Sequence, residues 1–403
     1  MRMRCLVIAL LSCSSWAAAA ASAAAAAVAP EMYGLVRVAN SASCSGAASG
    51  CAQLVSVDPA TGALAKIGAG HQALAALGDL VAIDGRRRTY YFLGGGWNSS
   101  ATYLVGLSLD TGAERCSAAL PAIGEYGVVG GGQSLSLDAA RDRLVITGLA
   151  APQGPHVALS VDLGGAGGAG GAGGGGCGPL TQLGSFPYSG SLPVAHASEL
   201  DDAGTTLYVD LAVDEHSYGI GVVDVAPPSA AAAATAAAAA TAAAPSLLKR
   251  VIPMDNGVQQ MWGMTWLAQA QRLVAVQHNT QEGTPRKYGA LDWRTLDPAA
   301  AAWTNAPLGH TAFNATMNFT ALWGNLGSVR AYDSKAGVLY ALLAIGRQEK
   351  VHIGAIDCAT GALQVFSPQL SEGGKLLWLS DGLLQLAAMP PHTRGAAGGD
   401  ARQ

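Results

Sequence analysis

Six side chains have the chemistry to bind a ligand or a metal ion, namely Asp79, Gln133, His196, Glu199, Trp262 and Asn325. Carboxylate and amide oxygens are preferred by Ca²⁺ and other divalent ions, so Asp79, Glu199 and Asn325 could assist a hydrolysis if they converged. His196 lies three residues before Glu199 and could act as a general base. Trp262 could stack on a sugar ring. The sequence assigns no catalytic residue.

Each of these residues also has a simpler structural explanation. A metal ion needs several oxygen ligands close together, and the three candidates occupy different places in the repeats described below. A lone histidine at the start of a strand is more often a hydrogen-bonded structural residue. Trp262 and Trp266 share one face of a predicted strand, where core packing is the simpler role. The sequence therefore favours a binding protein without a cofactor over an enzyme, with Ca²⁺ or another divalent ion as the alternative.

Repeated segments must position these side chains. The stretch LVSVDPATGALAKIG, residues 54–68, joins two runs of alternating apolar residues through a turn, and related segments follow. Their anchor residues are Asp58, Asp110, Asp162, Asp224, Asp292 and Asp357. A second unit, a short strand followed by a turn and an apolar strand, is anchored at Asp84, Asp138, Asp201, Ala268 and Asp333. The spacing from second to following first anchor is 23 to 26 residues, which indicates a rigid module.

The anchor aspartates have a mechanical role. A carboxylate at the end of a strand can accept hydrogen bonds from backbone N–H groups two residues further on, and a glycine supplies the positive φ that completes the turn. We therefore predict that Asp58, Thr61 and Gly62 are turn residues rather than catalytic ones.

Each full repeat contains four short strands within about 50 residues and no crossover helix, which is typical of a β-propeller. We predict an all-β fold of six blades, each with four antiparallel strands. Residues 32–40 would pair with an innermost strand at residues 375–381, so that the N-terminal and C-terminal strands close the ring. The alternative is a seventh blade that includes residues 382–389.

The segment that enters each innermost strand of a propeller borders the central channel. Five residues before each second anchor, with Asp381 as the last, stand Asp79, Gln133, His196, Gly263, Ser328 and Leu376. Glu199, Trp262 and Asn325 lie near this ring of positions. We therefore expect a ligand site at one end of the channel.

The N-terminus indicates secretion. Residues 1–29 combine a charged start, an apolar stretch and an Ala/Ser-rich end, as in a signal peptide. The alternative is an uncleaved membrane anchor, because residues 5–29 carry no charge. We expect the propeller over residues 30–389, low-complexity insertions at 164–176 and 229–245, and a disordered tail at 390–403.

Cysteines and sequons fit an extracellular protein. Three Asn-x-Ser/Thr sequons predict glycosylation at Asn98, Asn314 and Asn318. Cys44 and Cys51 flank a Gly/Ser-rich hexapeptide and could form a disulfide. The sequence leaves open the partners of Cys116, Cys177 and Cys358.

The turns VDPATG, LDTG and IDCATG resemble those of YVTN- and NHL-type propellers and, more loosely, of quinoprotein repeats. The resemblance covers nearly the whole mature chain and implies a propeller. These propellers include binding proteins, lactonases and oxidoreductases, so the fold does not select a function. A net charge of −4 argues against a nucleic-acid partner. We predict a secreted, non-catalytic binding or scaffold module for a glycan, peptide or protein; the alternative is a lactonase-like, divalent-metal-assisted hydrolase with its site in the channel.

Overall fold

The computed structural model describes a large part of the chain, in segments that carry the strands and most of their turns. The described residues are 31–38, 51–58, 60–71, 75–95, 102–123, 134–151, 154–164, 177–187, 198–212, 218–227, 246–253, 261–267, 270–279, 290–303, 309–312, 331–333, 337–345, 350–357, 359–360, 362–365, 367–372, 375–376 and 384–389. Within these ranges, no helix has the length and apolar composition needed to cross a membrane.

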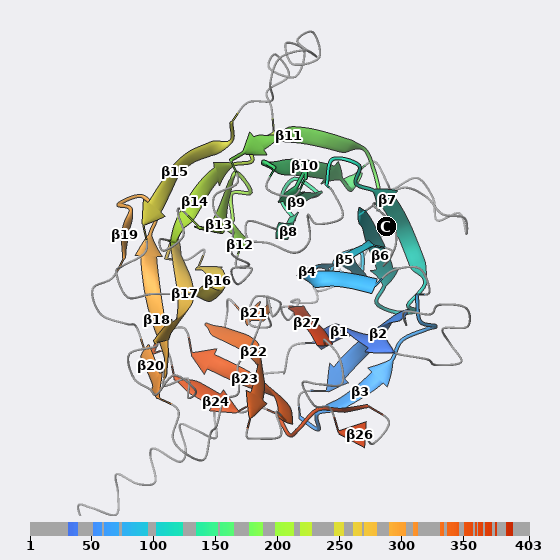
Figure 1. The fold of residues 1–403 in the computed structure, drawn as a ribbon. Helices are drawn as coiled ribbons and strands as arrows, with labels where there is room; N and C mark the ends of the chain where they lie inside the picture. The colour runs from blue at the N-terminus through green and yellow to red at the C-terminus, as the bar shows by residue number, and fades with distance from the viewer. Residues whose placement is uncertain are drawn as a thin grey trace, which may run out of the picture.

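Hydrogen bonds join the described strands into six sheets that lie around one axis (Figure 1). We call these sheets blades A to F. Five blades are built from consecutive strands, and in each of them the first strand is the innermost. Blade B comprises β4 (Ala75–Asp84), β5 (Thr89–Gly95), β6 (Thr102–Ser108) and β7 (Glu114–Ala119). Blade C comprises β8 (Ser134–Asp138), β9 (Arg143–Leu149), β10 (His156–Asp162) and β11 (Leu180–Phe186). Blade D comprises β12 (Ser198–Leu200), β13 (Thr206–Ala212), β14 (Tyr218–Asp224) and β15 (Leu248–Pro253).

The other two consecutive blades follow the same antiparallel order. Blade E comprises β16 (Met261–Leu267), β17 (Arg272–Asn279), β18 (Ala290–Asp297), β19 (Ala302–Trp303) and β20 (Gly309–Ala312). Blade F comprises β21 (Ala331–Asp333), β22 (Val338–Ile345), β23 (Lys350–Asp357) and β24 (Leu363–Val365). The radial arrangement of these sheets makes the chain a β-propeller.

Blade A joins the two ends of the chain. From the inside outwards it contains β27 (Leu384–Met389), β1 (Glu31–Val38), β2 (Cys51–Asp58), β3 (Ala63–Lys66), β25 (Ser371–Glu372) and β26 (Lys375–Leu376). The predicted closure through residues 375–381 is therefore wrong, because β26 lies at the outer edge of the sheet. The innermost strand is β27, which pairs with β1 over six residue pairs. This pairing also excludes residues 382–389 as the start of a seventh blade.

The prediction of uniform four-stranded blades is wrong as well, because blade A has six strands and blade E has five. In blade A the β25–β26 hairpin adds to the free edge of β3 through a short parallel pairing. In blade E two short strands, β19 and β20, share the outer edge of β18. The sequence between them includes Pro307, which has no N–H to donate to a ladder.

The hydrophobic core is divided into layers between neighbouring blades. One layer joins blades B and C through side chains such as Leu93, Leu104 and Ile146. Comparable layers join A to B, C to D, D to E and F to A. Because a fully buried Leu or Val side chain stabilises a fold by about 1.5–3 kcal/mol, these layers hold the ring together.

The predicted turn chemistry at Asp58 is confirmed. The Asp58 carboxylate accepts hydrogen bonds from the Ala60 N–H at 2.9 Å and the Thr61 hydroxyl at 2.6 Å, and Gly62 has a φ of +71°. Asp357 accepts comparable bonds from Ala359 and Thr360. Since the first and third strands of an antiparallel blade run in the same direction, the anchors that end them lie at one end of the ring. We call that end the turn face.

Two predicted anchors are corrected by the structure. In blade B the position of Asp58 is taken by Ser108, whose hydroxyl accepts hydrogen bonds from the N–H groups of residues 110 and 111. Asp110 instead accepts a bond from Arg88 at 2.5 Å. In blade E the turn is made by Asp297, which accepts bonds from residues 299 and 300, whereas Asp292 lies within β18.

Candidate functional site

The innermost strands of the blades surround the propeller axis, and Glu199 belongs to one of them (Figure 1). Glu199 is a half-buried residue of β12 and lies directly opposite Tyr208 of β13. Directly paired residues place their side chains on the same face of a sheet, so Glu199 shares a face with Tyr208. The Tyr208 ring stacks on Trp266 of blade E, with centroids 5.5 Å apart. Glu199 therefore lies on the face of blade D that packs against blade E.

Asp79 and Trp262 also lie on innermost strands, at irregular places. Asp79 is in the stretch of β4 between the paired residues Ala76 and Val81, where the register shifts. Trp262 stands between Met261 and Gly263 of β16, which pair with adjacent residues of β17, so Trp262 has no partner in the register. β-Bulges of this kind are frequent next to binding sites. Trp266, by contrast, is a buried core residue, as the sequence indicated.

Other predicted residues lie outside the described part of the chain. These are Gln133, His196, Ser328 and Asn325 from the channel ring and its surroundings, Cys44 of the expected disulfide, and Asn98, Asn314 and Asn318 of the sequons. Leu376 is described and was placed wrongly, because it belongs to β26 at the outer edge of blade A. The described residues include no group of three or more His, Cys, Asp or Glu side chains that could hold a metal ion.

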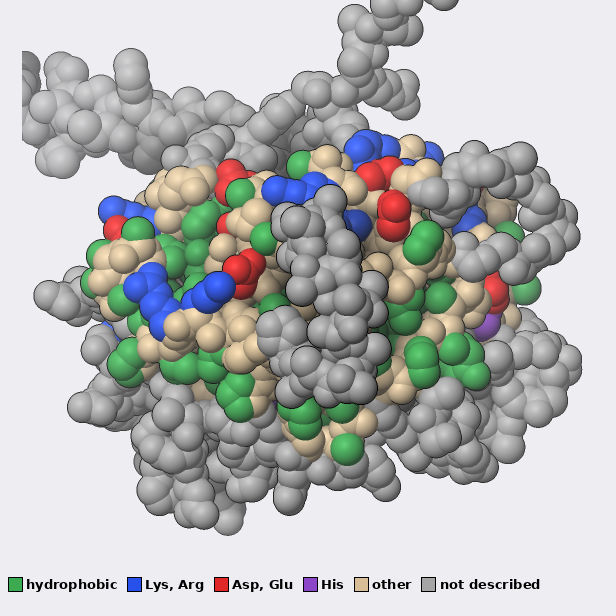
Figure 2. Space-filling view, turned by 90° about the horizontal axis from the view of Figure 1, so that it is seen from above, with side chains coloured by type: hydrophobic (Ala, Val, Ile, Leu, Met, Phe, Trp, Pro, Cys, Tyr) green, Lys and Arg blue, Asp and Glu red, His purple; other side chains and the backbone are tan. Residues whose placement is uncertain are grey.

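The turn face is occupied by contacts between blades. Arg86 donates to the Asp142 carboxylate of blade C at 2.7 Å, and Arg87 pairs with both Asp84 and Asp142. These guanidinium groups hold the pKa of Asp142 below its usual range. In the view of Figure 2, blue and red side chains lie side by side mainly in the upper half of the molecule.

The same pattern joins blades C and D. Arg143 is buried, donates to Asp138 at 3.0 Å, and reaches across to the carbonyl oxygens of Gly204 at 2.7 Å and Val225 at 2.9 Å. Between blades D and E, Trp266 donates to Asp202 at 3.0 Å. Several polar residues of the described turn face thus fix one blade against the next.

Asp210 is a notable residue that sequence reasoning missed. It lies on β13 with a fully buried side chain, and neither carboxylate oxygen has a hydrogen-bond partner in the structure as described. Burial raises the pKa of this carboxyl well above its usual range. The signal in the sequence is its place in the repeat: nine residues after the second anchor, blade B has Leu93, blade C has Thr147 and blade D has Asp210.

The described histidine with the strongest burial has a packing role. His156 begins β10, is 1% exposed, and stacks on Phe186 with ring centroids 4.8 Å apart. Burial lowers its pKa to about 4, so the ring is neutral at physiological pH. A neutral, stacked imidazole supports the fit between β10 and β11.

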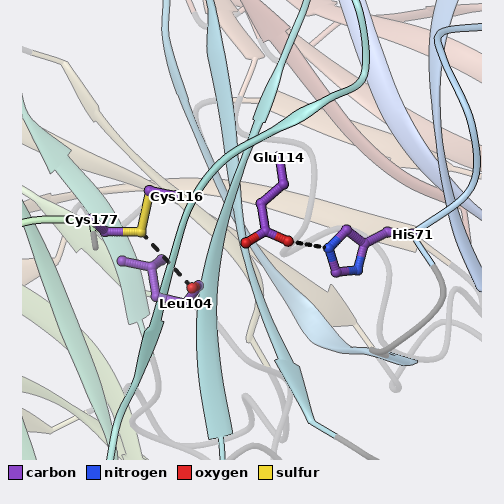
Figure 3. The surroundings of a disulfide bond; sticks show 5 residues. All are labelled: His71, Leu104, Glu114, Cys116 and Cys177. Carbon is purple, nitrogen blue, oxygen red and sulfur yellow. Dashed lines mark hydrogen bonds and ion pairs between the residues drawn. A yellow bond between two sulfur atoms is a disulfide. The ribbon is translucent and has the colours of Figure 1, made fainter. Parts of the chain in front are cut away.

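The outer strand of blade B is fixed on both sides, as Figure 3 shows. Cys116 of β7 forms a disulfide with Cys177, which precedes β11 of blade C. Glu114 of the same strand lies 2.6 Å from the imidazole of His71, which follows β3 of blade A. A register shift in β7 between these two residues lets them face different blades. The sequence left open the partners of three cysteines, and this disulfide pairs two of them with each other.

No protein family matches the sequence, and no curated protein does. Solved structures with a related fold include TolB from Acinetobacter baumannii, with a TM-score of 0.49 and 8% identity over 90% of this chain and 67% of that chain. An oligogalacturonate lyase in complex with manganese has a TM-score of 0.43 and 10% identity over 81% of this chain and 73% of its own. The β-propeller domain of the Trilobed protease from Pyrococcus furiosus has a TM-score of 0.36 and 7% identity, over 73% and 71%. These likenesses carry no function across, and the fold assignment rests on the sheet topology of this chain.

Proposed function

We propose that this chain is a secreted, non-catalytic binding propeller whose ligand is a glycan bound at the end of the channel opposite the turn face. The observation that supports this proposal is that Glu199 and Trp262 belong to β12 and β16, the innermost strands of neighbouring blades (Figure 1). Binding sites commonly combine aromatic surface with a few polar groups that fix the ligand's orientation. A carboxylate accepts hydrogen bonds from sugar hydroxyls, and an indole offers a flat apolar surface.

The contacts made on the turn face are the reason for placing the ligand at the opposite end of the channel. There the anchor aspartates close turns, and the arginines join blades, so these groups are already engaged. The residues that depart from the repeat, such as Glu199, Trp262 and Asp210, lie on the first two strands of blades D and E. Residues that occur in one blade only are not needed to build the repeated blades.

Binding to an immobilised glycan panel would test the proposal, with the mature wild-type protein compared with Glu199→Gln and Trp262→Ala. We expect both variants to lose binding to the same glycan by about tenfold or more while their melting temperatures stay near that of the wild type. Asp297→Asn is the matched control, because an asparagine can make the same turn. No binding by the wild type to any glycan, or equal binding by all four proteins, would contradict the proposal.

The alternative function, to be distinguished from glycan binding, is that of a metal-dependent hydrolase. Melting of the wild type in EDTA, followed by addition of Ca²⁺, Mg²⁺, Zn²⁺ or Mn²⁺, would reveal an ion that binds the native state. At about 100 times its dissociation constant such an ion stabilises a protein by about 2.7 kcal/mol. We expect no shift; a clear shift with one ion would favour the hydrolase.

We also propose secretion with removal of residues 1–29, glycosylation, and kinship with YVTN- and NHL-type propellers. N-terminal sequencing of protein recovered from the culture medium of a eukaryotic host tests the first point. A decrease in mass after glycosidase treatment tests the second. Protein retained in membranes with residues 1–29 intact would instead indicate an anchor.

A further inference from the structure

Asp210 differs from the other deeply buried carboxylates of the described structure. Asp84 is 1% exposed and pairs with Arg87 at 2.8 Å, and Asp138 is 3% exposed and pairs with Arg143 at 3.0 Å. Asp210 is 0% exposed, and no described group donates a hydrogen bond to either of its oxygens. An ionised carboxylate buried without a partner is strongly destabilising. We therefore expect the Asp210 carboxylate to bind a species that neutralises its charge.

Asp210 lies on the face of blade D that packs against blade E. Along β13 its side chain shares a face with Tyr208, which lies in the core layer between blades D and E. On β14 its direct neighbour is Ile220, and on β16 this layer contains Met264 and Trp266. The titratable positions on this face of blade D include Tyr208, Glu199 on β12 as a diagonal neighbour of Asp210, Tyr218 on β14 opposite Ala212, and Arg250 on β15 opposite Val222. β16 has no titratable side chain, and on β18 Arg294, opposite Ala275, lies on the face of blade E that packs against blade D. Neither Arg250 nor Arg294 hydrogen-bonds to the Asp210 carboxylate.

The species bound by Asp210 must be small. A fully buried side chain cannot touch a glycan in the channel without rearrangement, so the candidates are a proton and a small cation. A divalent ion prefers six or more oxygen ligands, and the described residues include no group of three or more acidic, His or Cys side chains that could hold a metal. A proton needs only the carboxyl itself.

We propose that Asp210 is a proton-binding site that makes the packing of blades D and E depend on pH. This inference is independent of the proposed glycan site. The repeat supports it, because the equivalent Leu93 of blade B is an apolar core residue and Thr147 of blade C is satisfied by Ser134 at 3.1 Å. A protonated Asp210 is uncharged and fits a layer built for such residues. Ionisation would place a charge between the two blades.

The sign of the effect follows from the raised pKa of the buried carboxyl. Below the ordinary pKa of about 4, the group is protonated in both native and unfolded chains and has no net effect. As pH rises above that value the unfolded chain releases its proton, whereas the native chain keeps it. The native state therefore loses stability progressively until the pH passes the folded-state pKa.

The experiment compares melting temperatures of wild type, Asp210→Asn and Asp210→Leu between pH 5 and pH 8. We expect each variant to melt above the wild type, by an amount that grows by about 2 °C per pH unit while only native Asp210 holds its proton. Asp357→Asn is the matched control, since this exposed carboxylate closes a turn. Its difference from wild type should not grow with pH in this way.

A second measurement does not depend on how well the variants fold. The infrared spectrum of the native wild type at neutral pH should contain the carbonyl band of a protonated carboxylic acid, and either variant should lack it. Absence of this band from the wild type, or a variant difference that stays constant with pH, would overturn the proposal. So would a rise in the melting temperature of the wild type at pH 8 with Ca²⁺ or Mn²⁺ that Asp210→Asn lacks, because Asp210 would then be a metal ligand.

Discussion

At the scale of single residues, buried charged side chains are paired, and their hydrogen bonds reach across blades. Arg143 is 5% exposed, and its guanidinium bonds to the Asp138 carboxylate and to two carbonyl oxygens of blade D. Charge-assisted hydrogen bonds are about twice as strong as neutral ones, and the water-excluded position strengthens them further. Asp138 and Arg143 therefore act as a unit that positions the turn of blade C against blade D.

Removal of Arg143 tests this pairing. Arg143→Met leaves Asp138 buried with only Arg141, at 3.1 Å, and leaves the two carbonyl oxygens without their donor. We expect the free energy of unfolding, measured with urea, to fall by about 3–5 kcal/mol. The double variant Asp138→Asn, Arg143→Met should lose less than the sum of the single losses. Arg141→Met is the control, because Arg141 is 35% exposed; an equal loss there would contradict the special role of Arg143.

Sequence reasoning succeeded at residues whose role is local and failed where the role depends on a neighbouring blade. The Asp58, Thr61 and Gly62 turn is contained within five residues, and its chemistry could be predicted from residue types alone. Asp110 and Asp292 were misassigned because a nearby Asp matched the pattern, whereas Ser108 and Asp297 make the turns.

The candidate site was the least predictable part. Position in the repeat correctly indicated that Glu199 belongs to an innermost strand, although its role remains a prediction. Asp210 was overlooked because it stands within the apolar stretch LYVDLA and looks like a strand residue. Alignment with Leu93 and Thr147 shows that a carboxylate here departs from the repeat. Its complete burial depends on blade E, which no local pattern encodes.

At the scale of elements, the Cys116–Cys177 disulfide fixes the outer strand of blade C after an interruption. The Gly-rich segment 164–176 separates β10 from β11 in the sequence. Cys177 immediately follows that segment and is 0% exposed. The disulfide therefore holds the start of β11 against β7 irrespective of the length of the insertion.

Loss of this bond should be costly. Cys116 and Cys177 are 61 residues apart, and closing a loop of that size reduces the entropy of the unfolded chain enough to stabilise the fold by about 4 kcal/mol. We expect the double variant Cys116→Ser, Cys177→Ser to show that loss in urea unfolding. A variant that lacks residues 165–176 but keeps both cysteines is the control and should retain wild-type stability. Equal destabilisation of the two variants would indicate that the insertion, rather than the disulfide, matters.

At the scale of the whole molecule, ring closure determines which strands are edges. The sequence offered two apolar segments near the C-terminus, residues 375–381 and 384–389, and either could have completed blade A. The structure uses 384–389 as the inner strand, whereas residues 375–376 pair with β25, which covers the edge of β3. The Ser371 N–H donates to the Gly62 carbonyl at 2.8 Å, and the neighbouring Leu370 N–H donates to the Val351 carbonyl of blade F at 2.8 Å, so this segment joins blade A to blade F. Alternation of apolar residues could not distinguish these roles, because they depend on closure in space.

Two truncations separate the functions of the C-terminal residues. Removal of residues 384–403 deletes β27, exposes the inner edge of β1 and opens the ring, and unpaired strand edges promote association between chains. We expect this variant to melt far below the wild type and to elute from size-exclusion chromatography as oligomers or aggregates. Removal of residues 390–403 keeps every pair between β1 and β27, so it should remain like the wild type in both measurements. If the longer truncation were as stable and as monodisperse as the shorter one, pairing of β27 with β1 would not be what closes the propeller.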